Sequence, residues 1–172
     1  MEKWDILNSD GEPTGKTTVR GQCRLKPGEY HLVVHIWAVS SKGEFLIQRR
    51  SENKKLMPGE WAATGGAAIS GEDSYTAANR ELYEELGIPS NGHSLKKLSR
   101  IKRRNSLLDI WFINTDIKIE NLRLQKSEVA EAKWVCKGEF ISMIENGEFH
   151  NYGSEYFETL FTKIDELRGV TV

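Results

Sequence analysis

The sequence is poor in cysteine, and its cysteines stand alone. The 172 residues include 2 cysteines, Cys23 and Cys136, which are far apart and belong to no CxxC pair. A zinc site or a redox-active pair therefore has no support in the sequence. We expect reduced structural thiols that are buried and inert, as free cysteines commonly are. The 4 histidines are also scattered along the chain: His31, His35, His93 and His150.

A charge excess of one sign and long apolar runs are missing as well. The formal net charge is -1, which argues against a dedicated nucleic-acid coat protein or a polybasic membrane anchor. No apolar run approaches the roughly 20 residues that span a bilayer, and the start of the chain shows no signal-peptide pattern. We therefore expect a soluble cytoplasmic protein, with residues 1–172 as a single domain.

The stretch from Gly66 to Ile88, GAAISGEDSYTAANRELYEELGI, holds the most informative pattern in the chain. It predicts a helix that begins near Ser74, which would act as the N-cap, and ends at Gly87 as a left-handed C-cap. Apolar residues recur every three or four positions along this helix, so one of its faces should be buried. That face comprises Tyr75, Ala78, Leu82 and Leu86.

An acidic face lies beside the apolar one. At about 100° per residue, Glu84 and Glu85 lie about 60° and about 40° to either side of Glu81, so three carboxylates share one face. Like charges at this spacing repel one another. A divalent cation such as Mg²⁺ or Mn²⁺ prefers carboxylate oxygens and would offset the repulsion. Without the cation, at least one of these carboxyl groups should have a raised pKa.

Nine residues of this stretch match the full Nudix box, G-x5-E-x7-R-E-U-x-E-E-x-G-U, in which U is apolar. They are Gly66, Glu72, Arg80, Glu81, Leu82, Glu84, Glu85, Gly87 and Ile88. The chain thus resembles the Nudix hydrolase superfamily. The resemblance implies an α/β fold, the Nudix α/β/α sandwich with a mixed β-sheet between helices. It also implies metal-dependent hydrolysis of a small-molecule diphosphate.

The resemblance assigns roles within the box. Glu84 and Glu85 would be the main metal ligands, and Glu81 would be a further ligand or a base that orients water. Arg80 would hold a carboxylate of the same cluster, which suits its bidentate geometry. Glu72 would either ligate the metal or hold the loop before the helix.

Further candidates lie outside the helix. The carbonyl oxygen of Gly65 would be a metal ligand, because glycine lets the backbone approach an ion closely. Glu128, in the segment SEVAEAKW, resembles an acidic Nudix residue with a metal or base role; a surface glutamate is the alternative. Four cationic residues would contact substrate phosphates: Arg49, Arg50, Lys54 and Lys55. A second basic group is more simply a solvated strand edge: Lys96, Lys97, Arg100, Lys102, Arg103 and Arg104.

From Tyr30 to Trp134 the order of segments is also similar to type-1 isopentenyl-diphosphate isomerases, a branch of the superfamily. Those isomerases carry a cysteine just before the box glycine and a histidine beside it, whereas this chain has Thr64 and Ala67. His31 matches one isomerase histidine, but a lone histidine beside a buried strand is more often structural. The complete box and the missing cysteine favour hydrolysis. The alternatives are the isomerase and a catalytically idle nucleotide-binding module.

Apolar and β-branched runs on both sides of the box predict the strands of the sheet. These are Tyr30–Val39, Glu44–Arg50, Trp61–Gly66, Leu95–Lys102, Leu107–Asn114 and Lys133–Val135. A helical pattern begins at Phe140, and an amphipathic helix closes the chain with Tyr156, Leu160, Ile164 and Leu167. Residues 1–29 read as an extended arm or hairpin that covers a sheet edge or a neighbouring subunit, and this arm is the hint of a homodimer.

We therefore expect a Mg²⁺- or Mn²⁺-dependent hydrolase that cleaves a diphosphate linkage in a nucleoside diphosphate derivative or a related phosphorylated metabolite. The box would handle the diphosphate, whereas loops outside it choose the attached group. The sequence therefore predicts the reaction class and leaves the substrate open.

Overall fold

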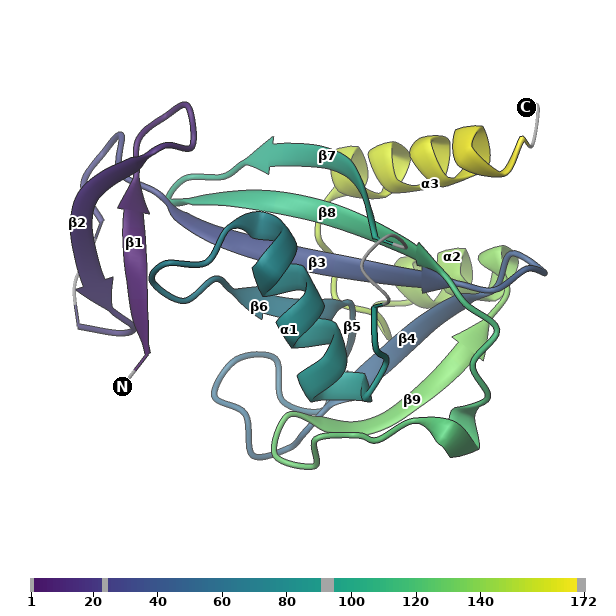
Figure 1. Cartoon of the computed structure of the whole chain (residues 1–172). Helices are drawn as coiled ribbons and strands as arrows, with labels where there is room; N and C mark the ends of the chain where they lie inside the picture. The colour runs from purple at the N-terminus through teal and green to yellow at the C-terminus, as the bar shows by residue number, and fades with distance from the viewer. Residues whose placement is uncertain (1, 23–24, 91–94, 170–172) are drawn as a thin grey trace.

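The computed structural model describes residues 2–22, 25–90 and 95–169, so Cys23 and His93 lie outside the described residues. Within these ranges seven strands form a mixed sheet, and two further strands form a small sheet of their own (Figure 1). The strands are β1 (Lys3–Leu7), β2 (Pro13–Val19), β3 (His31–Val39), β4 (Phe45–Arg50), β5 (Trp61–Ala62), β6 (Thr64–Ala67), β7 (Lys96–Lys102), β8 (Ser106–Asn114) and β9 (Val129–Val135). The helices are α1 (Ser74–Leu86), α2 (Lys137–Glu145) and α3 (Ser154–Arg168), with a 3-10 turn at Ile119–Asn121.

β3 is the central strand of the larger sheet. It pairs in parallel with β8, from His31 opposite Ser106 to Val39 opposite Asn114, and antiparallel with β4 and β6. β4 extends the sheet to β5 and β9, and β8 extends it to β7. β3 and β8 are mostly apolar and buried along their lengths, as expected for neighbouring parallel strands that helices cover on both faces.

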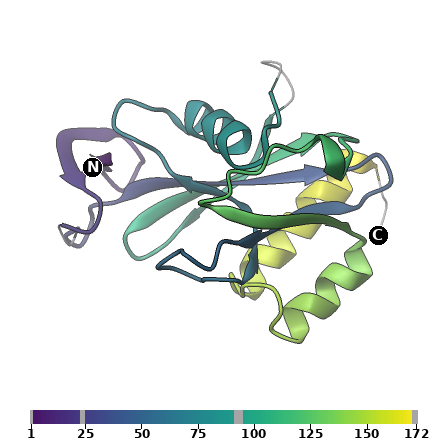
Figure 2. The same cartoon turned by 90° about the horizontal axis from the view of Figure 1, so that it is seen from below.

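Successive residues of β3 point to opposite faces of the sheet. Leu32, Val34 and Ile36 pack into one core with α1, whereas Trp37 and Val39 pack into a second core with α2 and α3. Figure 2 shows α1 on one side of the sheet and α2 and α3 on the other. The α/β/α sandwich expected from the sequence is confirmed.

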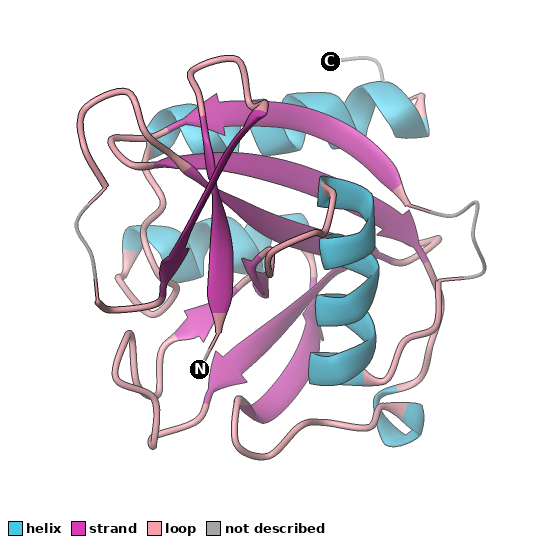
Figure 3. Cartoon of the chain, turned by 60° about the vertical axis from the view of Figure 1, so that its left-hand side comes forward, coloured by secondary structure: helices cyan, strands magenta, loops and turns pink. Residues whose placement is uncertain are grey.

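β1 and β2 form the N-terminal arm, an antiparallel hairpin (Figure 3) that lies beside the start of β3 (Figure 1). Leu7 of the arm forms a bridge with Tyr30. The Asp5 carboxylate accepts hydrogen bonds from the Ser70 hydroxyl at 2.6 Å and from the Gly71 N–H at 2.8 Å. The arm therefore packs against the loop that leads into α1 of its own chain. The homodimer and the extent of the domain stay predictions.

Some element boundaries differ from the sequence prediction. Trp61–Gly66 is two short strands instead of one, because β5 pairs with β4 whereas β6 pairs with β3. β9 begins at Val129 rather than Lys133, because its pairing with β4 continues further. α2 begins at Lys137, one turn before Phe140. The other predicted strands agree with the structure to within one residue at each end.

The caps of α1 are partly as expected. Asp73, not Ser74, is the N-cap: its carboxylate accepts a hydrogen bond from the Thr76 N–H at 2.7 Å. The Ser74 hydroxyl instead accepts a hydrogen bond from Nε1 of Trp111 at 2.9 Å, which ties the start of the helix to β8. Gly87 is the C-cap with a left-handed φ of 71°, as predicted.

Cys136 is exposed, which corrects the expectation of a buried thiol. It precedes α2 as its N-cap, where its sulfur accepts a hydrogen bond from the Glu139 N–H. Of the helices in the described part of the chain, none has the length and apolar character that crossing a membrane requires.

The N-cap assignment predicts a difference between two substitutions of Asp73. Asp73→Ala should lower the free energy of unfolding by about 1 kcal/mol, because the Thr76 N–H loses its partner, whereas Asp73→Asn should retain most of the stability. Urea unfolding followed by far-UV circular dichroism measures both. Equal stability of wild type and Asp73→Ala would show that the cap is not formed in solution.

Candidate active site

The apolar stripe of α1 sets which way its acidic face points. Ala78, Leu82 and Leu86 are buried against the sheet. Glu85 precedes Leu86 and is turned inward with it, so that only 3% of Glu85 remains exposed. Glu84 lies on the outer side of the same turn, with 47% of its side chain exposed. The helix therefore carries one buried and one open carboxylate at adjacent positions.

The Glu85 carboxyl group is held by the sheet. One of its oxygens accepts hydrogen bonds from Nε2 of Gln48 at 2.8 Å and from the Gly65 N–H at 3.1 Å. Burial, together with the nearby Glu81 carboxylate, raises the pKa of Glu85 to about 8. Burial also raises the pKa of Glu81. The raised carboxyl pKa expected in the absence of metal is therefore confirmed.

Arg80 binds the remaining carboxylates of the box. It forms a two-pronged pair with Glu72, at 2.7 Å from Nε and 2.9 Å from Nη2. Its Nη1 contacts Glu81 at 2.8 Å and Glu84 at 3.2 Å. Glu72 also accepts the Ile69 N–H at 3.0 Å. This arrangement supports the second role expected for Glu72, which is to hold the loop before α1.

A cavity of about 320 Å³ opens beside these carboxylates, and we call it the acidic cavity. Glu81, Glu84 and Glu85 line one wall, together with the backbone of Gly65 and Gly66. A Cβ at Gly66 would collide with the Glu81 carboxylate, and a Cβ at Gly65 would collide with backbone of β3. The absence of a side chain at Gly65 therefore lets β6 lie close to β3, and its absence at Gly66 leaves room for the Glu81 carboxylate of α1.

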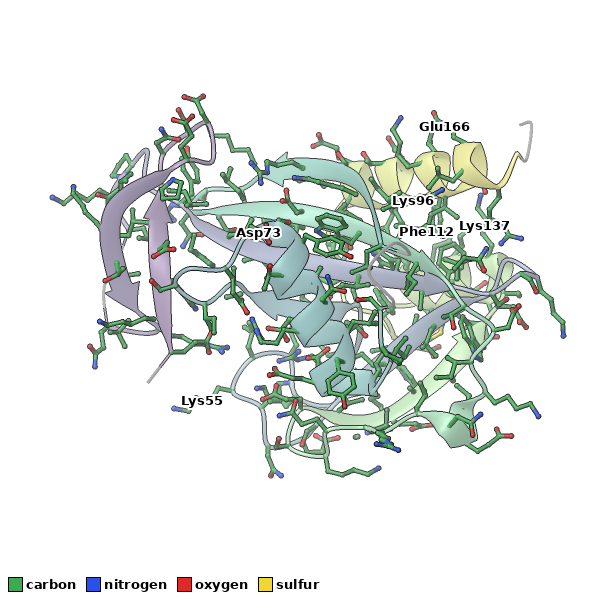
Figure 4. The ribbon with its side chains drawn as sticks, in the orientation of Figure 1. Lys55, Asp73, Lys96, Phe112, Lys137 and Glu166 are labelled. Atoms are coloured by element: carbon green, nitrogen blue, oxygen red, sulfur yellow. The ribbon has the colours of Figure 1, made fainter. Side chains whose placement is uncertain are left out.

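Cationic side chains also line the acidic cavity. They include Arg50 and Lys54, and Lys54 forms an ion pair with Glu128, a further lining residue. Arg49 and Lys55 do not line the cavity: Arg49 pairs with surface glutamates, and Lys55 points away from the molecule (Figure 4). The structure thus brings two of the four expected phosphate-binding side chains to the site and leaves the other two outside.

Comparison with known proteins agrees with this geometry. Residues 29–155 match the NUDIX domain family. The chain belongs to the Nudix family. It is 42% identical over 153 residues to a protein of Listeria monocytogenes described as an uncharacterized Nudix hydrolase, and the match covers 88% of this chain and 90% of that protein. The chain is therefore a Nudix hydrolase, an enzyme of a pyrophosphohydrolase family.

Solved structures show the same fold. DR0079 of Deinococcus radiodurans superposes with a TM-score of 0.77 at 23% identity, over 92% of this chain and 97% of that one. The NUDIX domain of NrtR from Shewanella oneidensis, solved in complex with ADP ribose, superposes with a TM-score of 0.63 at 13% identity, over 86% and 94%. These likenesses concern the fold alone.

Nudix enzymes generally use divalent metals, and the donor atoms of the acidic cavity suit them, because Mg²⁺ and Mn²⁺ favour carboxylate and carbonyl oxygens. In this structure, however, the carboxylates are not arranged as a metal site. Among the described residues, no three His, Cys, Asp or Glu side chains are arranged to hold a metal ion. Arg80 holds Glu81 and Glu84. A metal ion bound here would compete with Arg80 for these two carboxylates.

The second basic group lies mainly along the edge of the sheet. Lys97 and Arg100 contact the buried Asp109 carboxylate at 2.7 Å and 2.6 Å, and Lys102 lies over the ring of Tyr30. Lys96 and Arg104 are exposed. Arg103 differs from the rest, since it lines a second cavity beside the acidic one.

Gln48 is a site residue that the sequence interpretation missed. It is 1% exposed and is a hydrogen-bond donor to Glu85. A signal for it exists in β4: Leu46 packs under α1, and Gln48, two residues later, must point to the same face. A polar side chain there has to find a partner on α1.

The contact between Gly66 and Glu81 predicts that Gly66→Ala lowers activity. The added methyl group should displace the Glu81 carboxylate, and misplacement of a catalytic group by about 1 Å lowers turnover on the order of 10²-fold. Gly138→Ala is the matched control, because a Cβ at Gly138 meets nothing within 4 Å. Kinetic assays and thermal unfolding of both variants test this. Full activity of Gly66→Ala would exclude the proposed position of Glu81.

The pKa of Glu85 predicts how the metal-free protein responds to pH. Between about pH 4.5 and about pH 8, Glu85 keeps its proton in the folded state but has lost it in the unfolded state. Stability should therefore fall as pH rises through this window, by on the order of 4 kcal/mol in total. Glu85→Gln cannot ionise and should flatten the profile. Urea unfolding in EDTA between pH 4 and 9 measures the effect, and equal pH slopes for both proteins would contradict it.

Proposed function

We propose that this Nudix hydrolase cleaves a diphosphate linkage in a nucleoside diphosphate derivative or a related phosphorylated metabolite, with Mg²⁺ or Mn²⁺. The observation that carries the proposal is the mixed lining of the acidic cavity. Three carboxylates of α1 line the same space as Arg50 and Lys54. A diphosphate placed there would meet cationic side chains and also carboxylates that would bind its accompanying cations.

Glu84, Glu85 and the Gly65 carbonyl would hold the metal, and Glu81 would serve as a further ligand or orient the attacking water. The bound cation would neutralise charge on the bridging and leaving phosphate oxygens. Glu85 would have to lose its proton for this role, and the approach of a cation lowers the pKa of a neighbouring carboxyl group. Gln48 would keep the Glu85 carboxylate oriented after that proton is lost.

Arg50 and Lys54 would bind the substrate phosphates. Arg50 is 9% exposed, and its Nε donates to the carbonyl oxygen of Leu56 at 3.0 Å. It has no carboxylate partner among the described residues, so a nearly buried guanidinium faces the cavity with its charge uncompensated. Glu128 also lines the acidic cavity and forms an ion pair with Lys54. It would orient or deprotonate water once a phosphate draws Lys54 away.

Two observations weigh against the isomerase alternative. Thr64 stands where the isomerases carry their cysteine, and its side chain is buried within β6 with no thiol to exchange a proton. The box is complete, and its Arg80 binds the carboxylates of Glu72 and Glu81. The same intact carboxylates and the open cavity weigh against an idle nucleotide-binding module. ADP ribose, the ligand of the NrtR domain, is a reasonable first compound for a substrate panel.

The roles of the α1 carboxylates predict loss of turnover in two variants. Glu84→Gln and Glu85→Gln should each lower hydrolysis roughly 10²-fold or more, because each removes a charged metal ligand. Glu158→Gln, on the exposed face of α3, is the matched control. Activity is measured with Mg²⁺ and Mn²⁺ over a panel of diphosphates that includes ADP ribose and isopentenyl diphosphate, by phosphate release and mass spectrometry.

The panel separates the three candidate functions. Phosphate-containing products from a nucleoside diphosphate derivative support hydrolysis. Rearrangement of isopentenyl diphosphate without phosphate release would establish the isomerase instead. Saturable nucleotide binding without any product would establish the idle module. Full hydrolytic activity in both Gln variants would remove the assignment of the metal site to α1.

A further inference from the structure

A second cavity adjoins the acidic one and has a volume of about 480 Å³. The two share Arg20, Arg50 and the backbone of Gly65–Ala67 in their linings. Its volume falls in the range that holds small organic ligands. We call it the side cavity. If a diphosphate occupied the acidic cavity, its organic group would lie in the side cavity, next to Arg50.

The side cavity contains no carboxylate among its described lining residues, in contrast to its neighbour. Three arginines line it, namely Arg20, Arg50 and Arg103. Arg20 is paired with Glu2 at 3.0 Å. Arg50 lies at the boundary with the acidic cavity and would be taken by the diphosphate. Arg103 therefore supplies the positive charge that belongs to the side cavity itself.

Arg103 has no carboxylate partner among the described residues. Its guanidinium lies over the ring of Tyr152, 5.9 Å from the ring centroid, and the side chain is half-buried. A partly desolvated guanidinium without a counter-charge favours an anion. The neighbouring Arg104 is exposed and does not line the cavity. Of these two adjacent arginines, Arg103 presents its charge to the side cavity and Arg104 does not.

His35 adds a neutral donor to the same space. The Tyr156 hydroxyl accepts a hydrogen bond from Nε1 of Trp37 at 2.8 Å. Its own proton is therefore donated to Nδ1 of His35, which lies 2.9 Å away. His35 then carries its proton on Nε2. Burial and the charge of Arg103 lower the pKa of His35 to about 3, which keeps the ring neutral. His35 therefore offers a donor to the cavity, whose lining also includes Ser106 and Asn151, which can both donate and accept.

Aromatic rings also line the side cavity. Trp4 of the N-terminal arm stacks on His31, with ring centroids 4.4 Å apart, and the Arg20 guanidinium lies 6.0 Å from the centroid of the Trp4 ring. The Arg103 guanidinium lies over the ring of Tyr152. A sugar or nucleobase ring in the cavity would pack against these rings and guanidinium groups. An isoprenoid chain would leave Arg103 and the His35 N–H without partners, so a hydrocarbon group fits this cavity poorly.

We propose that the side cavity binds the organic group of the diphosphate substrate, and that this group is a sugar or nucleobase ring system carrying a further phosphate or carboxylate, which Arg103 receives. The inference rests on the proposed function, because it places the diphosphate in the acidic cavity. It makes Arg103 a specificity-determining residue. It also gives the N-terminal arm a part in substrate binding, through Trp4.

Two matched pairs of ligands test the proposal. NADPH and NADH differ by one phosphate, and UDP-glucuronate and UDP-glucose differ by one carboxylate, so the pairs separate the two sources of negative charge. Isothermal titration calorimetry on the metal-free protein in EDTA measures affinity without turnover. We expect the charged member of at least one pair to bind roughly tenfold more tightly or better, as a charge-assisted hydrogen bond provides.

Arg103→Gln should remove this preference by weakening the charged member alone, to the affinity of its neutral partner. Arg104→Gln, the same change one residue away, should leave the preference unchanged. Equal affinities within both pairs in the wild type would overturn the proposal. So would a loss that affects charged and neutral members alike in Arg103→Gln, or a loss of preference in Arg104→Gln.

Parallel hydrolysis assays with Mg²⁺ and Mn²⁺ distinguish this proposal from the proposed function. Hydrolysis of diphosphates without any charge preference leaves the function standing and excludes the role of Arg103. A preference in binding that depends on Arg103, with no hydrolysis of any diphosphate, supports the side cavity and excludes the function.

Discussion

The buried carboxyl group of Glu85 is the constraint on which the rest of the site depends. It lies between α1 and the sheet, where Gln48 and the Gly65 N–H bind it. A carboxylate in such a place is stable only if it is protonated or has a cation beside it. Burial in the fold raises the pKa of Glu85 to about 8 in the metal-free protein. A cation bound beside it would favour the charged form.

The close approach of helix and sheet follows from the same contact. For the Gly65 N–H to reach Glu85, β6 has to lie close to α1. Glycine at position 66 leaves room for the Glu81 carboxylate of α1, and glycine at position 65 leaves room for the backbone of β3. Arg80 then neutralises the carboxylates that remain, with Glu72 holding it from the loop. The charge repulsion that an isolated helix of this sequence would suffer is thus offset within the fold, by an arginine in the metal-free state.

Two adjoining cavities with different linings meet at Arg50 and Gly65–Ala67. The acidic cavity combines carboxylates with Arg50 and Lys54, whereas the described lining of the side cavity has cationic, aromatic and neutral polar groups without acidic ones. The two linings also share Arg20. A substrate that spans both spaces would present its diphosphate to one and its ring system to the other.

Local patterns predicted the elements of the fold well. The apolar run of β3 and the stripe on α1 carry enough periodicity to place strand and helix, because each pattern depends only on neighbours in the chain. The errors have tertiary causes. Trp61–Gly66 divides because its two halves pair with different strands, and Ser74 gives up the capping position because its hydroxyl binds Trp111. Neither partner is visible from the local sequence.

The sequence by itself determined the acidic face of Glu81, Glu84 and Glu85, since fixed spacing on one helix sets which side chains share a side. Only the tertiary structure decided which other side chains share a space with that face. It brings Arg50 and Glu128, both candidates from the sequence, to the acidic cavity and leaves Arg49 and Lys55 outside. It also places Gln48 against Glu85. Trp4 and Arg103 meet in the side cavity from segments about a hundred residues apart. Such neighbours depend on strand pairing and on the docking of the arm, which periodicity along the chain does not encode.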